Sequence, residues 1–298
     1  MFKYLDQMKV AILGKINKSE PTEYITNLIT LLEKRNVSVF LECNYFNSLN
    51  GFISKSISSF EELDKSYDLL ISIGGDGTIL KAITFVKDLS IPIVGVNSGR
   101  LGFLAKIQID NIEQVIEEII SGNYSISERT VIEVSTSETN KQLSKLNFAL
   151  NEITLSRKNT TSMISIDTKL NNKHLNSYWA DGLIISTPTG STGYSLSCGG
   201  PIIMPEAENL IINPIAPHNL NARPLIIPDS TEIKIKVNGR ENEFLISLDS
   251  RITTLSNSNE VIIKKSPFKI KMIELENESF LITLREKLMW GKDKRNLQ

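Results

Sequence analysis

Residues 68–78 read DLLISIGGDGT, an apolar run that stops at a turn containing three glycines and one aspartate. The run from Asp68 to Ile73 has the length and apolar content of a buried strand, and Ile79 to Phe85 has helical character. A strand, a glycine turn and a helix in this order are typical of an α/β unit with a parallel sheet. This stretch therefore predicts the fold class of the first part of the chain.

The sequence on either side continues the alternation of strands and helices. Buried strands are expected at Lys9–Leu13, Val37–Leu41 and Ile91–Val96, and helices over Pro21–Lys34 and residues 110–122. In the second helix, Asp110 is expected to cap the start and Gly122 to end the helix.

The pattern then changes to short β-rich segments separated by turn residues, among them TVIEVST, FALNEITLS, GLIISTPT and EFLISLDS. The alternation in Thr231–Val237 predicts a strand with one buried face. These segments indicate a sandwich of packed sheets, after which Phe280–Trp290 is helical again and is expected to pack on the first domain. We predict an α/β + β fold: an N-terminal α/β domain with a parallel sheet over residues 1–107, completed by 279–298, and a C-terminal all-β sandwich over 108–278.

Composition limits the classes of function. The chain has 298 residues, 41% of them hydrophobic, and a net charge of −1 from 33 basic and 34 acidic residues. This balance argues against a nucleic-acid binder that relies on a global positive field, although local donors can still bind a phosphorylated ligand. The two cysteines have no metal-type spacing, and no apolar stretch is long enough for a membrane span. We expect a cytoplasmic protein with no membrane or nucleic-acid partner.

The glycine turn has the features of a phosphate site. Gly74, Gly75 and Gly77 lack Cβ atoms, so phosphate oxygens can approach the amides at a helix start. Asp76 repels a phosphate unless it holds a metal ion or accepts a proton, which suggests Mg²⁺ chemistry, a general base, or both. A simple β-turn with a capping aspartate is the alternative. Neither a Walker A loop nor a GxGxxG fingerprint is present.

A second cluster, ADGLIISTPTGSTGY, covers Ala180–Tyr194 and continues to Pro201. Its hydroxyl and amide groups carry almost no charge and suit a neutral polar ligand such as a base, an amide or a ribose. Asp181 could bind a ribose diol or an exocyclic amine, and Tyr194 could stack on a ring or pack in the core. The alternative is a long Ser/Thr-rich turn.

Asn151 and Glu152 interrupt the apolar run FALNEITL. Adjacent side chains of a strand point to opposite faces, so at least one of the two is buried unless the strand bends. Asn can pair with an adenine edge and Glu with ribose hydroxyls, whereas the alternative is solvation at a strand edge. His174, in an expected hairpin, and His218, in a proline-bounded loop, are interpreted as structural.

Together these stretches resemble the NAD kinase family. GGDGT (74–78), NE (151–152), residues 180–201, PIAPHNLNARPLIIP (214–228) and VNSGRLGFLA (96–105) follow the family's order and approximate spacing over nearly the whole chain. GGDGT alone is shared with lipid kinases and, loosely, with phosphofructokinases. The stretch 180–201 separates this family from both.

The resemblance implies ATP-dependent phosphorylation of the 2′-hydroxyl on the adenosine ribose of NAD⁺, giving NADP⁺ and ADP. It also implies a divalent cation, Mg²⁺ with the ATP, and a homodimer or homotetramer. A lipid kinase of the diacylglycerol or sphingosine type and a non-catalytic NAD-binding sensor are kept as alternatives. Intact Asp76 argues against the sensor, and the Ser/Thr-rich loop argues against the lipid kinase.

The resemblance also carries roles onto individual positions. Asp76 would accept the proton of the 2′-hydroxyl. The phosphate-binding positions would be Gly74, Gly75, Gly77, Thr78 and, one helical turn later, Lys81. The NAD-binding positions would be Asn151, Glu152, Asp181, Thr192, Gly193, Tyr194, Ser195, Leu196, Ser197 and Ala216.

Two positions depart from the family pattern. Gly193 stands where many relatives have Ala. In SLDSR, Asp249 fits the family pattern, but Arg251 replaces a neutral amide. Arg251 is expected either to bind a phosphate, from its own or a neighbouring subunit, or to pair with Asp249.

Overall fold

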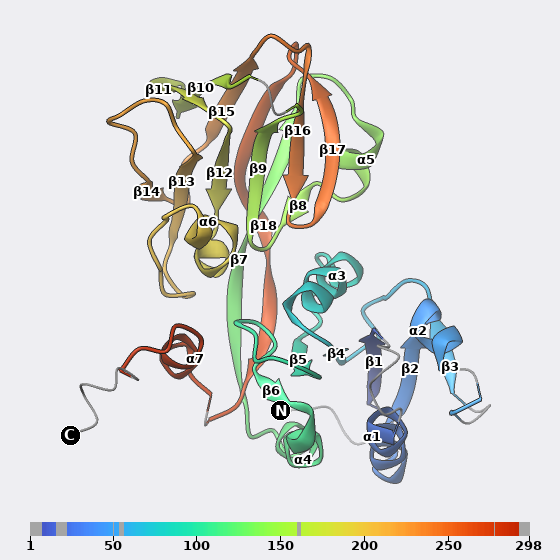
Figure 1. The fold of residues 1–298 in the computed structure, drawn as a ribbon. Coiled ribbons are helices and arrows are strands. Elements are labelled where there is room, and N and C mark those ends of the chain that lie inside the picture. Colours follow the sequence, from blue (N-terminus) through green and yellow to red (C-terminus); the bar gives the residue numbers. More distant parts are fainter. Residues whose placement is uncertain are drawn as a thin grey trace. The chain divides into compact units, whose positions relative to one another are not determined.

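The computed structural model describes residues 8–15, 23–49, 51–53, 57–159, 162–276 and 278–291. The chain forms two compact units (Figure 1): unit 1 comprises Met1–Glu128 and Ile270–Gln298, and unit 2 comprises Arg129–Lys269. The boundaries therefore lie about 20 residues and 10 residues inside the second domain that the sequence predicts. Both fall within long strands, β7 (Ser125–Thr136) and β18 (Glu260–Glu274).

Unit 1 contains a parallel sheet with the strand order β3-β2-β1-β4-β5. Its strands are β1 (Lys9–Gly14), β2 (Ser38–Glu42), β3 (Ser58–Phe60), β4 (Leu69–Ile73) and β5 (Ile93–Asn97). The strand β6 (Ile107–Gln108) pairs with β5, as does the end of β18, where Met272 lies beside Ile93. Strands β4 and β5 are buried at every position, as expected of a sheet covered on both faces. The predicted parallel sheet is confirmed.

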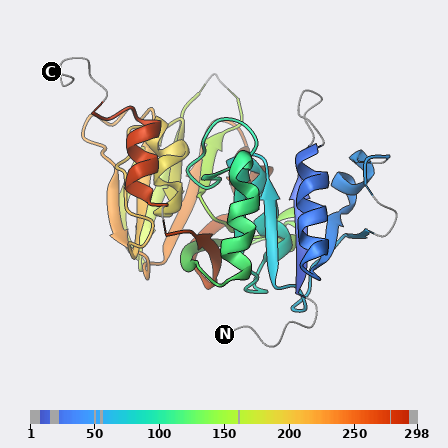
Figure 2. The same ribbon diagram turned by 90° about the horizontal axis from the view of Figure 1, so that it is seen from below.

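Helices α1 (Glu23–Lys34) and α4 (Ile112–Ile120) lie side by side on one face of this sheet (Figure 2). The apolar face of α4, with Ile112, Val115, Ile116 and Ile119, packs into the same core cluster as α1 and alternate residues of the strands. This burial is why α4 belongs to unit 1 and not to the second domain. Asp110 lies within a 3₁₀ turn (Ile109–Asn111), and the N-cap of α4 is Asn111, so the expected Asp110 cap is wrong.

The other helices of unit 1 are α2 (Cys43–Ser48), α3 (Asp76–Val86) and α7 (Phe280–Lys287). Helix α3 contacts β1, β4 and β5, and it buries Ile79, Ala82, Ile83 and Val86. Helix α7 confirms the predicted return of helical structure, and its N-cap is Ser279, whose hydroxyl accepts the Ile282 N–H. The first residues of the helix predicted from Pro21 lie outside the described residues.

Unit 2 is an antiparallel sandwich (Figure 1). One sheet has the order β14-β13-β12-β9-β16-β17, and the other layer contains β11, β10, β15 and β18 with β7 and β8. These strands are β8 (Phe148–Ala149), β9 (Glu152–Arg157), β10 (Ile164–Leu170), β11 (Lys173–Ala180), β12 (Gly182–Ser186), β13 (Asn209–Ile215), β14 (Leu225–Pro228), β15 (Ile233–Asn238), β16 (Glu243–Leu248) and β17 (Arg251–Ser256). One core cluster takes residues from both layers, which confirms the predicted sandwich. Short helical segments are α5 (Lys141–Lys145), η2 (Thr189–Thr192) and α6 (Tyr194–Ser197).

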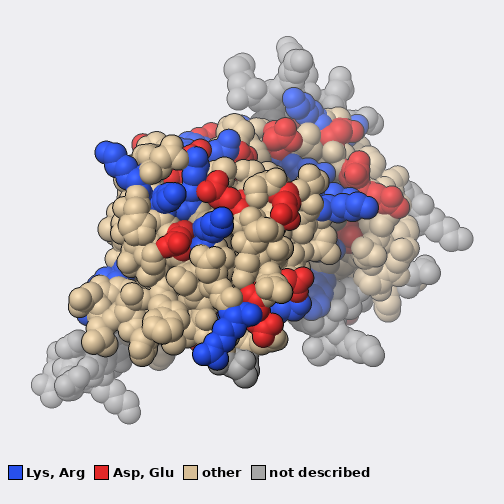
Figure 3. Space-filling view, turned by 90° about the horizontal axis from the view of Figure 1, so that it is seen from above, with Lys and Arg blue, Asp and Glu red and all other residues tan. Residues whose placement is uncertain are grey.

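Basic and acidic side chains are interspersed on the face shown in Figure 3, which agrees with the near-zero net charge. Among the helices that the structure describes, none combines the length and the apolar character needed to cross a membrane.

Candidate functional site

The glycine turn joins β4 to α3 as the sequence predicts. Gly74 has a φ of +147°, and a Cβ there would lie 2.2 Å from Thr78 Oγ1. Only glycine fits a backbone position with both properties. Gly75 is the N-cap of α3 without a side-chain cap, and Asp76 is the first residue of the helix. The turn thus brings backbone N–H groups to a helix start at which no side chain forms a capping hydrogen bond.

Asp76 holds a distant segment of unit 1 against this helix start. Its Oδ1 accepts the N–H groups of Leu104 and Ala105 at 3.0 and 2.9 Å, and its Oδ2 accepts that of Phe103 at 2.9 Å. A carboxylate offers about four acceptor positions, so roughly one remains for a further donor. Asp76 can therefore accept one further donor, such as a hydroxyl, and its own position is fixed by backbone groups about 28 residues away in the chain.

Lys81, one turn further along α3, has a carboxylate partner within unit 1. Its Nζ lies 3.2 Å from Glu42 Oε1, and Glu42 is buried at the start of α2. Burial raises the pKa of Glu42, but hydrogen bonds from Asn44, the Tyr45 N–H and Lys81 outweigh it, and the pKa is lowered. A contact of Lys81 with a phosphate stays a prediction.

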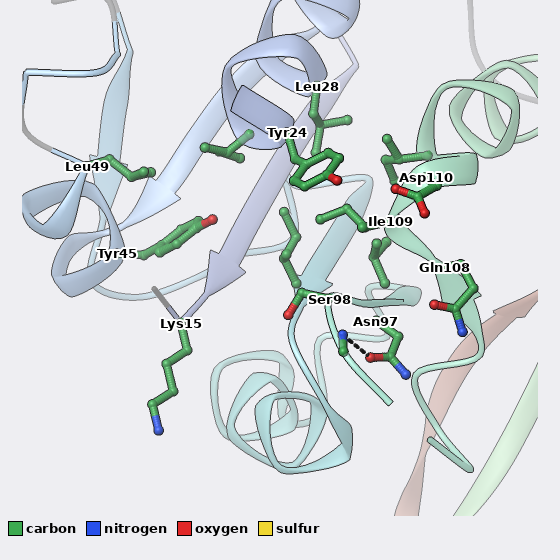
Figure 4. Close-up of a pocket in the computed structure, with 15 residues that line it drawn as sticks. Lys15, Tyr24, Leu28, Tyr45, Leu49, Asn97, Ser98, Gln108, Ile109 and Asp110 are labelled. Carbon is green, nitrogen blue, oxygen red and sulfur yellow. Dashed lines mark hydrogen bonds between the residues drawn. The ribbon is translucent and has the colours of Figure 1, made fainter. Parts of the chain in front are cut away.

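A hollow of about 270 Å³ lies at the carboxyl ends of β1, β4 and β5 (Figure 4). The Tyr24 and Tyr45 rings border it, together with Lys15, Ile73 and Asn97. Strand order in this sheet reverses between β1 and β4. In open α/β sheets, ligands bind outside the carboxyl ends of the strands at such a reversal. The hollow is therefore a second candidate site in unit 1.

In unit 2, the NE pair lies where the strand bends. Leu150 and Asn151 separate β8 from β9, so the two polar side chains do not alternate across one strand. A Cβ placed on Gly193 would lie 3.1 Å from Glu152 Oε2 and 3.6 Å from Asn151 Nδ2. Both side chains therefore face the Ser/Thr-rich loop, which brings together two of the sequence-predicted motifs.

The Ser/Thr-rich loop is bonded directly to this bend. The Thr187 N–H donates to Asn151 O at 2.9 Å, and Thr187 Oγ1 donates to Leu150 O at 2.6 Å. Gly190 lies so close that a Cβ there would be 2.1 Å from Asn151 O. Glycine at this position is what lets the two backbones touch.

The residues predicted in 192–197 divide into structural and exposed groups. Ser195 is fully buried, and Asn213 Nδ2 donates to its carbonyl oxygen at 2.9 Å and to its hydroxyl at 3.3 Å. Thr192 Oγ1 donates to Thr189 O at 3.4 Å. Tyr194 is 46% exposed, Leu196 is half-buried and Ser197 is exposed. Tyr194 is thus outside the core and accessible to a ring.

Asp181 and Ala216 lie at the other end of β12. The register pairs Gly182 with Ile215, and Ser186, at the far end of the strand, with Glu152. The Asp181 carboxylate lies 3.0 Å from an Arg157 nitrogen, and Ala216 is exposed with a φ of 43°.

Carboxylates from both ends of β12 act on the Tyr194 phenol by their charge. Burial raises the pKa of its phenol, Cys198 raises it further through charge and a hydrogen bond, and the carboxylates of Asp181 and Glu152 add to the effect. The phenol is therefore kept protonated and can act as a donor.

Glu152 has the most perturbed environment of the site. Burial, and then the negative charge of Asp249, raise its pKa to about 8, although the Tyr194 N–H bond opposes the shift. Among the described residues, Asn151 Oδ1, Glu152 Oε2 and Thr189 Oγ1 are buried without a hydrogen-bond partner. Buried polar atoms are nearly always paired in proteins, so these three atoms in one region make it a candidate site for a polar ligand.

The Arg251 side chain bonds to backbone groups of its own unit. Its guanidinium donates to Leu146 O at 3.1 Å and to Phe148 O, and it lies 3.7 Å from Asp249 Oδ2. The expected pairing with Asp249 is confirmed, whereas a phosphate contact stays a prediction. Asp249 itself is a residue whose role the sequence does not reveal, because DS between two apolar strands signals only a turn.

The two histidines lie away from the glycine turn and the NE bend in the chain, and their structural role stays a prediction. His174 is exposed on β11, beside the β10–β11 turn, and the His218 ring packs at 5.4 Å on Trp179. No group of three or more His, Cys, Asp or Glu side chains within the described ranges could hold a metal ion.

The fold and both regions agree with known proteins. Family models described as the N-terminal and C-terminal domains of ATP-NAD kinase match residues 10–124 and 150–275. The NAD kinases of Christiangramia forsetii and Flavobacterium psychrophilum are 55% and 54% identical to this chain, each over 97% of it and 100% of the relative. The crystal structure of yeast NADH kinase complexed with NADH is similar with a TM-score of 0.85 and 25% identity, over 96% of this chain and 89% of that one. An NAD kinase from Archaeoglobus fulgidus in complex with ATP shares the fold, with a TM-score of 0.73 and 24% identity over 95% and 99% of the two chains.

Proposed function

This chain belongs to the ATP-NAD kinase family, and from that premise we propose that it transfers the γ-phosphoryl group of ATP to the 2′-hydroxyl on the adenosine ribose of NAD⁺. The observation that carries the proposal is the 55% identity to a curated NAD kinase over 97% of the chain. Neither the lipid-kinase nor the sensor alternative gains support from the matches.

The polar groups of unit 2 suit the adenosine part of NAD⁺. Asn151 Oδ1 and Glu152 Oε2 are two of the buried oxygens without a hydrogen-bond partner among the described residues, and an adenine amine and ribose hydroxyls can donate to them. The exposed Tyr194 ring offers a stacking surface. Thr192, Gly193 and the α6 residues Ser195, Leu196 and Ser197 form the rest of this acceptor region in the proposal. Asp181 and Ala216 would bind another part of the dinucleotide, because they lie at the other end of β12.

The glycine turn of unit 1 suits the phosphates. Backbone N–H groups at the start of α3 can donate to phosphate oxygens, so no buried Lys or Arg is needed there. The turn itself consists of Gly74, Gly75, Gly77 and Thr78. Asp76 would accept a hydrogen bond from the 2′-hydroxyl at its remaining acceptor position. Because phosphoryl transfer has a loose transition state, the hydroxyl loses its proton late in the reaction. The Asp76 carboxylate would therefore first orient the hydroxyl and then accept its proton.

The family's divalent cation fits this site only as a companion of the triphosphate. Asp76 is the one carboxylate of the turn, and three of its acceptor positions are taken by backbone N–H groups. Mg²⁺ is commonly bound through substrate phosphates, waters and one or two carboxylates. In the proposal, Asp76 would hold no Mg²⁺ by itself, and the ion, bound through the phosphates of ATP, would supply charge neutralisation.

The hollow of Figure 4 is our candidate for the base of the phosphoryl donor. It lies at the same edge of the sheet as the glycine turn, since Ile73 lines it and Gly74 follows directly. Its tyrosine rings suit a planar heteroaromatic ring, and Lys15 at its border is a cation. Tyr45→Ala is expected to raise the KM for ATP at least fivefold and to leave the KM for NAD⁺ within twofold; equal changes in both would refute this placement.

The decisive experiment is formation of NADP⁺ from ATP and NAD⁺ by the purified chain, with Asp76→Asn as its partner. We expect Asp76→Asn to retain NAD⁺ binding by calorimetry and to lose about 10²- to 10⁴-fold in kcat, the range of positioned acid–base groups. Turnover near the level of the unmodified chain would show that Asp76 is not the proton acceptor.

We further propose a homodimer or homotetramer in the cytoplasm. Support comes from large apolar side chains of unit 2 that are exposed in a single chain, among them Trp179 (52%) and Leu220 (90%). Exposed apolar side chains that lie together are typical of interaction surfaces, and the Trp179 N–H donates to Asn219, the residue before Leu220. Sedimentation equilibrium of the purified chain measures the subunit number.

A further inference from the structure

The turn between β16 and β17 carries a buried carboxylate that bonds to the bend at the NE pair. Asp249 has a φ of 53°, and its side chain is 2% exposed. Its Oδ1 accepts the N–H groups of Asn151 and Glu152 at 2.8 and 3.2 Å, and its Oδ2 accepts that of Leu150 at 3.0 Å. Its own N–H donates to Glu152 O at 2.9 Å.

These bonds explain why the strand bends where it does. Three consecutive N–H groups that point to one carboxylate cannot alternate between two neighbouring strands, as they do in a regular ladder. The carboxylate replaces a strand partner, and β9 starts only at Glu152. As a result, Asn151 and Glu152 present both side chains to the Ser/Thr-rich loop.

Arg251 fixes the residues before the bend to the same turn. Its guanidinium bonds to the carbonyl oxygens of Leu146 and Phe148, and its centre lies 5.3 Å from the Phe148 ring centroid. Its charge faces the Asp249 carboxylate at 3.7 Å. The hairpin β16–β17 therefore holds the segment 146–152 through backbone contacts on both sides of the bend.

We propose that Asp249, supported by Arg251, is a positioning residue that sets where Asn151 and Glu152 stand for substrate binding. The inference rests on the proposed function, in which those two side chains bind the adenosine of NAD⁺. Asp249 touches no substrate in this account and acts only through the bend.

Charge gives Asp249 a second effect on Glu152 that a purely structural residue lacks. The groups that face Glu152 are the Asp249 carboxylate, the Tyr194 N–H and phenol, and the Cys198 thiol. Of these, Asp249 is the one that raises the pKa of Glu152 by its charge. Removing that charge lets Glu152 ionise at a lower pH.

The test compares Asp249→Asn with Asp229→Asn, a matched control. Asp229 is also a buried carboxylate of unit 2 and pairs with Lys265 at 2.5 Å. It belongs to neither the NE pair nor the Ser/Thr-rich loop. Asp249→Asn keeps one acceptor atom but loses the charge and the Leu150 bond. We expect the Kd for NAD⁺ to rise about tenfold, the KM for ATP to stay within twofold, and the pH inflection of NAD⁺ binding to move to lower pH. Asp229→Asn is expected to change none of these.

Amide hydrogen exchange gives a readout that needs no substrate. Peptides covering 148–154 are expected to exchange faster in Asp249→Asn than in the unmodified chain or in Asp229→Asn. If Asp249→Asn fails to fold, Arg251→Gln is measured instead, with faster exchange over 146–150 and a three- to tenfold higher Kd for NAD⁺ expected. Unchanged exchange, or an unchanged Kd and pH inflection, would overturn the inference. Failure of the unmodified chain to form NADP⁺ would overturn the proposed function, while the exchange result still decides the role of Asp249.

Discussion

Glu152→Gln is expected to make unfolding free energy less dependent on pH. The pKa of Glu152 is raised from an ordinary 4.5 to about 8, by burial first and then by Asp249. Between these values the native chain holds a proton that the unfolded chain has lost. The native state is therefore penalised as pH rises through this window, by up to about 1.4 kcal/mol per pH unit.

The full difference corresponds to about 5 kcal/mol, an upper limit because the surrounding structure relaxes. Glutamine has nearly the same shape and cannot ionise, so it escapes the penalty. Relative to the unmodified chain, the variant should differ by a constant below about pH 4 and become progressively more stable from there up to about pH 8. Above pH 8 the gain should level off.

Urea unfolding followed by circular dichroism at half-unit steps from pH 5 to pH 9 measures this difference. Glu243→Gln is the matched control, since Glu243 is in the same unit but 50% exposed and paired with Lys158 on the surface. Its difference from the unmodified chain should stay flat with pH. A flat difference for Glu152→Gln as well would mean that Glu152 is already ionised in the native chain, and the argument from burial would fail.

Two other predictions concern stability. Gly190→Ala places a Cβ 2.1 Å from Asn151 O and should lower the unfolding free energy, measured in urea, by about 1–3 kcal/mol. Gly77→Ala, with nothing within 4 Å of the added atom, should change it by less than about 0.5 kcal/mol. Equal effects of the two would contradict the close approach at Gly190. Ser279→Ala removes the cap of α7 and should cost about 1 kcal/mol, seen as faster amide exchange confined to residues 280–287.

The sandwich and the parallel sheet could be predicted because they depend on local patterns. The alternation in β15 puts Ile233, Ile235 and Val237 in the core, as expected from a period of two. Domain boundaries could not be placed in this way. The apolar face of α4 is evident in the sequence, but the sequence does not indicate which sheet covers that face. In the structure, α4 packs in the same core cluster as α1.

The candidate sites show the same division. Motifs gave the positions of Asp76, Asn151 and Glu152, and the resemblance gave their roles. Their partners lie far along the chain, at Phe103–Ala105 for Asp76 and at Asp249 for the NE bend. No short-range signal predicts such pairs, because backbone N–H groups are present at every residue except proline.

By itself, then, the sequence determined where strands end, where glycines let a backbone approach, and which side chains carry chemistry, since these depend on a few adjacent residues. Only the tertiary structure decided that Asp76 is held by three amides, that Lys81 pairs with Glu42, and that Arg251 turns inward. The physical reason is that a buried charge must find donors or countercharges wherever the fold brings them, and the folding of the whole unit determines which residues those are.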